Sequence, residues 1–236
     1  MSRVLVVTPT YNERDNLEGF VGAVHDALPE AHVLVVDDAS PDGTGKIADR
    51  LAGRDDRVRV LHRSGKLGIG SAYLEGFRLG LRDGYDVLFQ MDTDLSHDPK
   101  YLPDFLAAID RGADVVLGSR NIAGGGVEGW GPGRHLLSKG GSLYSRAILG
   151  LPIRDLTSGY KAWRRDVLEA MDLSEVRSEG YSFQIEMTWR AIGRGFTVRE
   201  VPIVFEDRRA GKSKMSRQIF LEAVLMVWKL RLEGHG

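Results

Sequence analysis

The first half of the chain repeats one unit: a short apolar run, a polar loop, and a segment with apolar residues at helical spacing. The apolar runs are Val4 to Val7, Val33 to Val36, Val58 to Leu61, Val87 to Met91 and Val115 to Gly118. The segments between them are Asn16 to Leu28, Asp42 to Leu51, Gly70 to Leu81 and Pro99 to Ile109. This repetition predicts an α/β fold with a mostly parallel sheet and helices on both faces. Ligands of such sheets bind at the carboxyl ends of the strands.

The second half is less regular. A glycine-rich stretch, Gly124 to Gly133, is expected to have no regular structure. Beyond it we expect the helices His135 to Leu149 and Phe183 to Ile192, the loop Asp155 to Gly159, and the strands Lys161 to Arg164 and Val198 to Phe205. A basic loop, Glu206 to Lys214, follows. No linker of disordered composition separates the halves, so we expect one domain with a subdomain built on its second half.

The last segment, Ser216 to Leu232, is too apolar all round for an ordinary solvent-facing helix. It is either a core or dimer helix, or an interfacial helix that holds Trp228 and its basic residues at the level of lipid headgroups.

Composition excludes several classes of protein. The chain has 236 residues, a formal net charge of −1 and no cysteine. The charge gives no bulk attraction to nucleic acid, and the missing cysteines exclude disulfides and thiolate metal sites. No run approaches the ~20 apolar residues that span a bilayer. The apolar N-terminal run is broken by Pro9, so it does not read as a signal peptide. We therefore expect a cytoplasmic protein.

Two carboxylates stand two residues apart directly after an apolar strand, in FQMDTDLSH, Phe89 to His97. On a strand, Asp92 and Asp94 would point the same way. Hard oxygen ligands at a strand end suit Mg²⁺ or Mn²⁺ together with phosphate oxygens, and Ser96 adds a hydroxyl. The alternative is an acidic turn that caps the next helix, for which Asp98 is the expected cap. The acidic pair by itself leaves both interpretations open.

The loops after the other strands carry side chains suited to binding a nucleoside or an anion. Tyr11 is placed to stack on a base, and Glu13 and Asp38 are placed to accept hydrogen bonds from a nucleoside. Lys66 lies among glycines before a helix N-terminus, a position that favours anions, although the spacing is not that of a P-loop. Each of these residues alone also fits a structural role in a turn or on the surface.

Taken in order, the loops resemble the family 2 glycosyltransferases of the GT-A fold, and more closely the polyprenol-phosphate mannose synthases. The likeness covers nearly the whole chain. It is carried by TYNERDNL (10–17), VVDDASPDGT (35–44), GKLGIGSA (65–72), MDTDLSHDP (91–99), LGSRN (117–121), LLSKGGSLYSR (136–146), RDLTSGYKAWRRDVL (154–168), GYSFQIEM (180–187) and EVPIVFEDRRAGKSKMS (200–216).

The resemblance implies roles for individual residues. The residues that bind the donor would be Pro9, Tyr11, Glu13, Val36, Asp38, Asp92, Thr93, Arg208 and Lys214. The acceptor phosphate would be held by Arg120, Arg134 and Ser138, and the metal by Asp94 and Ser96. Asp92, Asp94 and Arg120 would be the catalytic residues. Within the single domain 1–236, residues 1–120 would form the nucleotide-sugar half, 121–214 the acceptor half, and 215–236 an amphipathic helix.

The implied reaction transfers mannose from GDP-mannose to a polyprenyl monophosphate with inversion, at the cytoplasmic face of a membrane that the protein touches peripherally. Such an acceptor is already ionised near neutral pH, so it needs no general base. Asp155 is the nearest candidate base and is better explained as an organiser of Arg154 or of the acceptor pocket. Two alternatives stay open: a family 2 transferase that uses UDP-glucose or another nucleotide-sugar, and a receiver-like or nucleotide-binding regulatory domain.

Overall fold

A computed structural model describes residues 2–129, 132–176, 178–206 and 225–232, with side chains of the helix at 132–149 described from Lys139 onward. Its strands are β1 (Val4–Thr10), β2 (His32–Asp37), β3 (Val58–His62), β4 (Val87–Gln90), β5 (Val115–Ser119), β6 (Gly126–Glu128), β7 (Lys161–Arg164), β8 (Val198–Pro202) and β9 (Val204–Glu206). Its helices are α1 (Leu17–Ala27), α2 (Thr44–Ala52), α3 (Ile69–Arg82), the 3₁₀ turn η1 (Pro99–Tyr101), α4 (Leu102–Asp110), α5 (Pro132–Leu149), α6 (Arg165–Ala170) and α7 (Gly180–Gly193).

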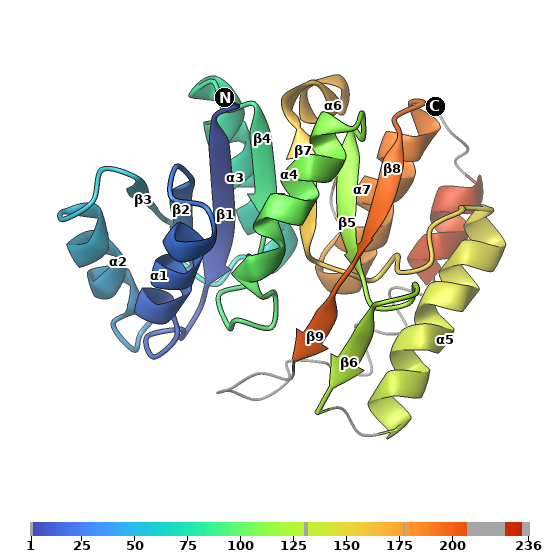
Figure 1. Ribbon diagram of the computed structural model, residues 1–236, viewed down its shortest axis with the longest axis horizontal. Helices are drawn as coiled ribbons and strands as arrows, with labels where there is room; N and C mark the ends of the chain where they lie inside the picture. The colour runs from blue at the N-terminus through green and yellow to red at the C-terminus, as the bar shows by residue number, and fades with distance from the viewer. Residues whose placement is uncertain (1, 130–131, 177, 207–224, 233–236) are drawn as a thin grey trace.

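Seven strands form one sheet in the order β3-β2-β1-β4-β7-β5-β8 (Figure 1). All neighbours are parallel except β7, which runs antiparallel to both β4 and β5. The prediction of a mostly parallel sheet is therefore confirmed. The chain runs outward from β1 to β3 and then returns to β4 on the other side of β1. This reversal makes the β1–β4 boundary a switch point, where open α/β sheets bind ligands.

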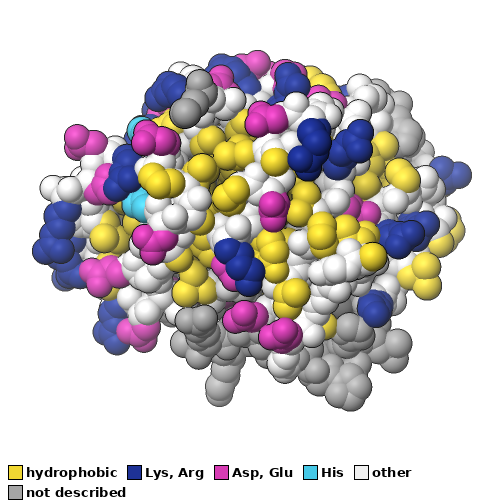
Figure 2. Space-filling model, in the orientation of Figure 1, with side chains coloured by type: hydrophobic (Ala, Val, Ile, Leu, Met, Phe, Trp, Pro, Cys, Tyr) yellow, Lys and Arg dark blue, Asp and Glu magenta, His cyan; other side chains and the backbone are white. Residues whose placement is uncertain are grey.

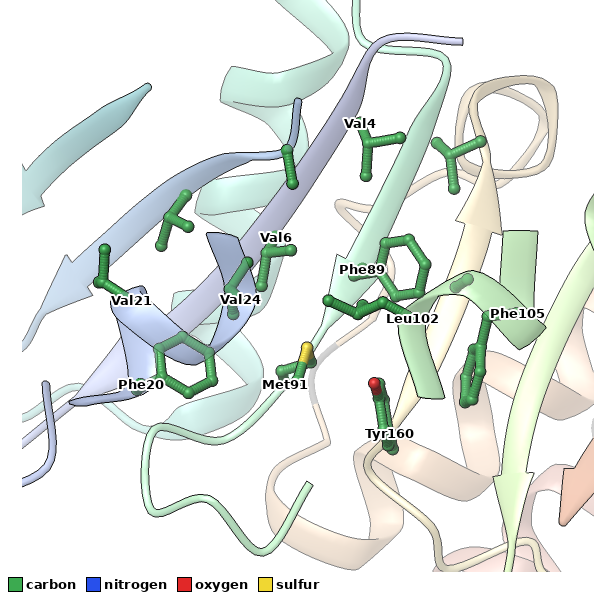
Figure 3. Packing of buried hydrophobic residues seen from close by; sticks show 14 of the residues in the cluster. Val4, Val6, Phe20, Val21, Val24, Phe89, Met91, Leu102, Phe105 and Tyr160 are labelled. Atoms are coloured by element: carbon green, nitrogen blue, oxygen red, sulfur yellow. The ribbon is translucent and has the colours of Figure 1, made fainter. Parts of the chain in front are cut away.

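Helices cover both faces of the sheet (Figure 1). On one face α1, α2 and α4 pack on alternate strand residues such as Val4 and Val6, and Phe20, Phe89, Phe105 and Tyr160 fill the space between them (Figure 3). On the other face α3, α6 and α7 pack on the intervening residues, among them Leu5 and Val7. Side chains that alternate along β1 thus enter two separate cores, as the period of a strand requires.

Two expectations for the second half were wrong in detail, and one helix was missed. The glycine-rich stretch contains a strand, β6, because backbone groups can pair without side chains: Gly126 N–H donates to the Ile203 carbonyl at 3.0 Å. The single strand expected over Val198 to Phe205 is two, since β8 joins the large sheet and β9 pairs with β6 after Pro202. Helix α6 was not expected, and its six residues are too short to show a helical period.

The helical residues 225–232 pack against α5 and α7 at one end of the molecule (Figure 1). Val227 and Leu230 are buried there beside Leu149 and Trp189. Large apolar side chains on the outside of α5 and of the helical residues 225–232 stay exposed. They are Leu143, Leu225, Trp228 and Leu232. Within the described residues, no helix combines the length and the apolar character needed to span a membrane.

Acidic and basic side chains are interspersed over the described part of the face seen in Figure 2. The charge of this face is therefore mixed in sign, in keeping with a formal net charge of −1.

Candidate active site

The loops after β1, β2 and β4 lie side by side, because these three strands are neighbours in the sheet. Each loop holds one non-glycine residue in the left-handed region: Asn12 at φ 61°, Ala39 at φ 53° and Leu95 at φ 60°. These are the only non-glycine residues with positive φ in the part of the chain that is described. Such conformations are costly for residues other than glycine, and they concentrate at functional sites.

The acidic pair lies in the loop after β4, because the strand ends at Gln90. The prediction that a strand points both carboxylates the same way was therefore wrong, because Asp92 and Asp94 lie in a loop that turns at Leu95. Asp92 Oδ1 accepts a hydrogen bond from the Tyr73 hydroxyl at 3.0 Å. Asp94 Oδ1 accepts from the Ser96 N–H at 3.1 Å and from its hydroxyl at 2.6 Å. Asp98 does cap η1, accepting from the Lys100 N–H at 3.0 Å.

Tyr73 was missed by sequence reasoning, because it occupies an apolar position of a helix and has no chemical signature there. Its ring is fully buried between Phe77 and Phe183, with ring centroids 6.0 Å and 6.1 Å away. Burial and the neighbouring Asp92 charge raise the pKa of its hydroxyl well above the usual value. Tyr73 therefore keeps its proton and holds Asp92 by donating it.

The oxygens of Asp94 and Ser96 suit a hard divalent cation. The Ser96 hydroxyl donates to Asp94 Oδ1 at 2.6 Å, so these two oxygens lie side by side in the loop after β4. Within the described residues, no group of three or more His, Cys, Asp or Glu side chains is arranged to hold a metal ion. The protein groups seen here would thus supply part of a coordination shell, to which water and phosphate oxygens add the rest.

Four of the predicted donor residues lie at or just beyond the ends of β1, β2 and β4. Thr93 donates to the Pro9 carbonyl at 3.2 Å and shares a 2.7 Å hydrogen bond with Thr8, which ties the β4 loop to β1. Val36 is buried within β2. Lys66 Nζ lies 4.6 Å from the centroid of the Tyr11 ring. The structure thus brings Pro9, Tyr11, Val36 and Thr93 to one edge of the sheet, and their roles there stay predictions.

Two predicted hydrogen-bond acceptors already have protein partners. The carboxylate of Asp38 accepts from Arg63 Nη1 at 2.8 Å and from the Leu67 N–H at 3.0 Å. The carboxylate of Glu13 accepts from the Asn16 side chain at 2.8 Å. Asp38 therefore shapes the loop after β3, in addition to any contact with a nucleoside.

The N-terminus of α3, which the glycine-rich loop precedes, is occupied by a carboxylate of the protein. Glu179 accepts from the backbone N–H of Gly70 at 2.7 Å and of Ser71 at 3.1 Å. A Cβ on Gly68 would lie 2.6 Å from this carboxylate. Gly68 and Gly70 therefore allow the close approach of α7 to α3, and the anion held at this helix end is Glu179.

On the other side of β7, Arg120 and Asp155 form a buried ion pair. Asp155 Oδ2 accepts from Arg120 Nε at 2.7 Å and from its backbone N–H at 3.0 Å, while Oδ1 accepts from Nη2 at 2.7 Å. The exposed fractions of the two side chains are 8% and 0%. Burial alone would raise the pKa of Asp155, but the charge and hydrogen bonds of Arg120 lower it. Asp155 therefore organises Arg120 and not Arg154, whose backbone N–H donates to Glu200.

Four predicted site residues cannot be placed. Arg208 and Lys214 lie outside the described residues, and the side chains of Arg134 and Ser138, in the first turns of α5, do as well. Their assignment to the donor diphosphate and the acceptor phosphate stays a prediction.

Comparison with known proteins assigns the family. Residues 5–172 match the family model described as "Glycosyl transferase family 2". The chain belongs to glycosyltransferase family 2. The polyprenol monophosphomannose synthase of Mycolicibacterium smegmatis is 56% identical over 232 residues, covering 97% of this chain and 88% of that protein. The undecaprenyl-phosphate mannosyltransferase of Micrococcus luteus is 51% identical over 236 residues, covering 99% and 97%.

Solved structures of glycosyltransferases share the fold. The glucosyl-3-phosphoglycerate synthase of Mycobacterium tuberculosis, solved with Mn²⁺, UDP and glucosyl-3-phosphoglycerate, superposes with a TM-score of 0.70 at 19% identity, covering 99% of this chain and 81% of that one. The family 2 chain described here therefore has the GT-A fold that the sequence predicted. Its family is one of transferases, so the regulatory-domain alternative is not supported.

Proposed function

We propose that this glycosyltransferase moves mannose from GDP-mannose to a polyprenyl monophosphate with inversion. The observation that carries the proposal is the identity of 56% and 51%, along nearly the whole chain, to two proteins named for the transfer of mannose to a polyprenyl phosphate. The site is compatible with this reaction because acidic oxygens stand at the switch point and a buried arginine stands two strands away.

In the proposed reaction, an oxygen of the acceptor phosphate attacks the anomeric carbon, and the bond from that carbon to the diphosphate of the donor breaks. GDP departs with the bonding electron pair, and a single displacement inverts the configuration. The residues 1–120 would hold the donor and 121–214 the acceptor. Arg120, fixed by Asp155, is the described cation best placed to bind the acceptor phosphate, with Arg134 and Ser138 proposed beside it.

We assign Asp94 and Ser96 to a Mg²⁺ or Mn²⁺ ion, with Asp92 on the donor side. Such a cation, when bound, supplies charge neutralisation to the departing diphosphate. The chain itself fixes the geometry: Tyr73 holds Asp92, and the turn at Leu95 holds Asp94 against Ser96. Arg208 and Lys214 are proposed to contact the same diphosphate.

The state of Asp155 supports an acceptor that needs no base. Both its oxygens accept hydrogen bonds from Arg120, and its pKa lies below the usual value. A general base with a lowered pKa and both oxygens engaged is poorly suited to take a proton from a sugar hydroxyl. A phosphate acceptor carries its negative charge already.

The decisive experiment incubates the protein with Mg²⁺, a short-chain polyprenyl phosphate and GDP-mannose, and analyses the lipid fraction by mass spectrometry. We expect a mannosylated lipid phosphate of β configuration. UDP-glucose, offered in parallel, tests the alternative donor, because the M. tuberculosis neighbour carries UDP. Product from UDP-glucose and none from GDP-mannose would contradict the mannose assignment.

The metal assignment has its own test within this assay. Asp94→Asn removes a carboxylate oxygen and is expected to lower kcat by at least about 100-fold. Asp98→Asn makes the same chemical change four residues away, and asparagine is an equally good helix cap there. Equal activity of the two variants would contradict the assignment of Asp94.

We also propose peripheral contact with the cytoplasmic face of a membrane, where the lipid acceptor lies. The supporting observation is the exposed apolar set Leu143, Leu225, Trp228 and Leu232, on two helices that pack together. Sedimentation with liposomes containing polyprenyl phosphate is expected, and Trp228→Ser is expected to reduce it. A protein that stays in the supernatant at low salt would refute the contact.

A further inference from the structure

Lys161 is a fully buried cation that the proposed reaction does not use. It begins β7, the strand inserted between β4 and β5, and its register partners are Gln90 and Leu117. Its side chain has no exposed surface. Lys161 therefore sits between the strand that leads to Asp92 and the strand that leads to Arg120.

The partners of the Lys161 ammonium are all uncharged. Nζ donates to the Gln184 carbonyl at 2.7 Å and to Gln184 Oε1 at 3.1 Å. Gln184 Oε1 also accepts from Gln90 Nε2 at 2.7 Å. Among the described residues, no carboxylate lies within salt-bridge distance of Lys161, while the buried Arg63 and Arg120 each pair with an aspartate.

An isolated buried ammonium is costly, and a neutral side chain of similar length would fill the same space without that cost. Burial lowers the pKa of Lys161 to about 7, an effect that the charge of Asp155 partly offsets. A local arrangement that costs stability without a compensating ion pair is expected where function requires it.

The charged groups around the site determine whether the charge of Lys161 can act on a bound phosphate. Arg120 and Asp155 cancel one another, and Asp92 and Asp94 offset a divalent cation. The protonated form of Lys161 therefore places a positive charge beneath this edge of the sheet that no carboxylate of the described residues pairs with. The proposed reaction brings an acceptor phosphate and a donor diphosphate together at that edge.

We propose that Lys161 is a positioning residue for the transfer: its buried charge favours the approach of the two phosphate groups without touching either. This inference rests on the proposed function. At an effective permittivity of about 20, a unit charge about 10 Å away changes the stability of an anion by on the order of tenfold.

Three variants separate charge from structure. Lys161→Gln removes the charge and keeps a donor for Gln184, whereas Lys161→Met removes both. Lys100→Gln is the matched control, because Lys100 lies at the same end of the sheet but is 55% exposed and paired with Asp98. The measurements, made at about pH 6 where Lys161 is protonated because its pKa is about 7, are kcat/KM for GDP-mannose, the Kd of GDP with Mn²⁺, and the melting temperature.

We expect both Lys161 variants to lose about tenfold in kcat/KM without a fall in melting temperature, and Lys100→Gln to stay within about twofold. Because a buried charge is poorly screened, the loss should persist as ionic strength rises. Wild-type kcat/KM in Lys161→Gln would overturn the proposal, as would failure of both variants to fold, which would make Lys161 a folding residue.

Failure of the proposed function would look different. In that case wild-type protein would form no mannolipid, and the binding of GDP or UDP with Mn²⁺ to the three variants would still test Lys161. Weaker binding to both Lys161 variants, and not to Lys100→Gln, would support its role at the diphosphate. Equal binding to all would overturn it.

Discussion

Asp155→Asn should be among the most destabilising single substitutions in this protein, although it changes only one oxygen to an amide. The carboxylate accepts three hydrogen bonds from Arg120, at 3.0, 2.7 and 2.7 Å, and a fourth from the Thr157 hydroxyl at 3.2 Å. The substitution leaves the guanidinium of Arg120 buried without a counter-charge. Removing one partner of a buried ion pair typically costs about 3–5 kcal/mol.

The pH dependence of this cost follows from the lowered pKa of Asp155. A carboxyl whose pKa is lower in the folded state contributes stability above its unfolded pKa and loses it as pH falls through the folded value. The difference in the free energy of unfolding between wild type and Asp155→Asn should therefore be complete at pH 7 and shrink once the pH falls below the usual carboxyl pKa of 3.8.

Denaturant unfolding at pH 7 measures the difference. The matched control is Asp166→Asn, because Asp166 also accepts two hydrogen bonds from an arginine, Arg164. In that pair the side chains of Arg164 and Asp166 are 42% and 52% exposed. A surface pair of this kind is worth less than about 1 kcal/mol. An equal loss in the two variants would refute the reasoning, as would a loss below about 1 kcal/mol in Asp155→Asn.

Three further predictions follow from individual contacts. Tyr73→Phe keeps the stacked ring and removes the hydroxyl on Asp92, so KM for the donor should rise roughly tenfold, as steady-state kinetics would show, with little change in melting temperature. In the wild type, the free energy of unfolding should rise with pH between about 7 and 10.5, because Lys161 keeps its proton in the unfolded chain and has released it in the folded one. Denaturant titrations should show a slope of at most about 1.4 kcal/mol per pH unit, and Lys161→Met should abolish it. Gly68→Ala should lower the free energy of unfolding by at least about 2 kcal/mol, because Gly68 has φ 105° and faces Glu179, whereas Gly65→Ala, with open space around it, should not.

The sequence determined the architecture of the first half and predicted which of its loops form the donor side of the site. Hydrophobic period is a local property, so the strands and helices from β1 to β5 could be predicted from it, and parallel strands bring their carboxyl ends to one edge. Asp92, Asp94, Tyr11 and Thr93 were therefore expected near one another, and they lie in the loops after the adjacent strands β1 and β4.

Only the tertiary structure decided how the polar groups pair. The partners Tyr73 and Asp92 are 19 residues apart, Arg120 and Asp155 are 35 apart, and Glu179 lies 109 residues from the helix end it occupies. No local pattern records such contacts, because they depend on which strands become neighbours. The antiparallel insertion of β7 is the clearest case. It places Lys161 between β4 and β5, where burial lowers the pKa of its ammonium to about 7.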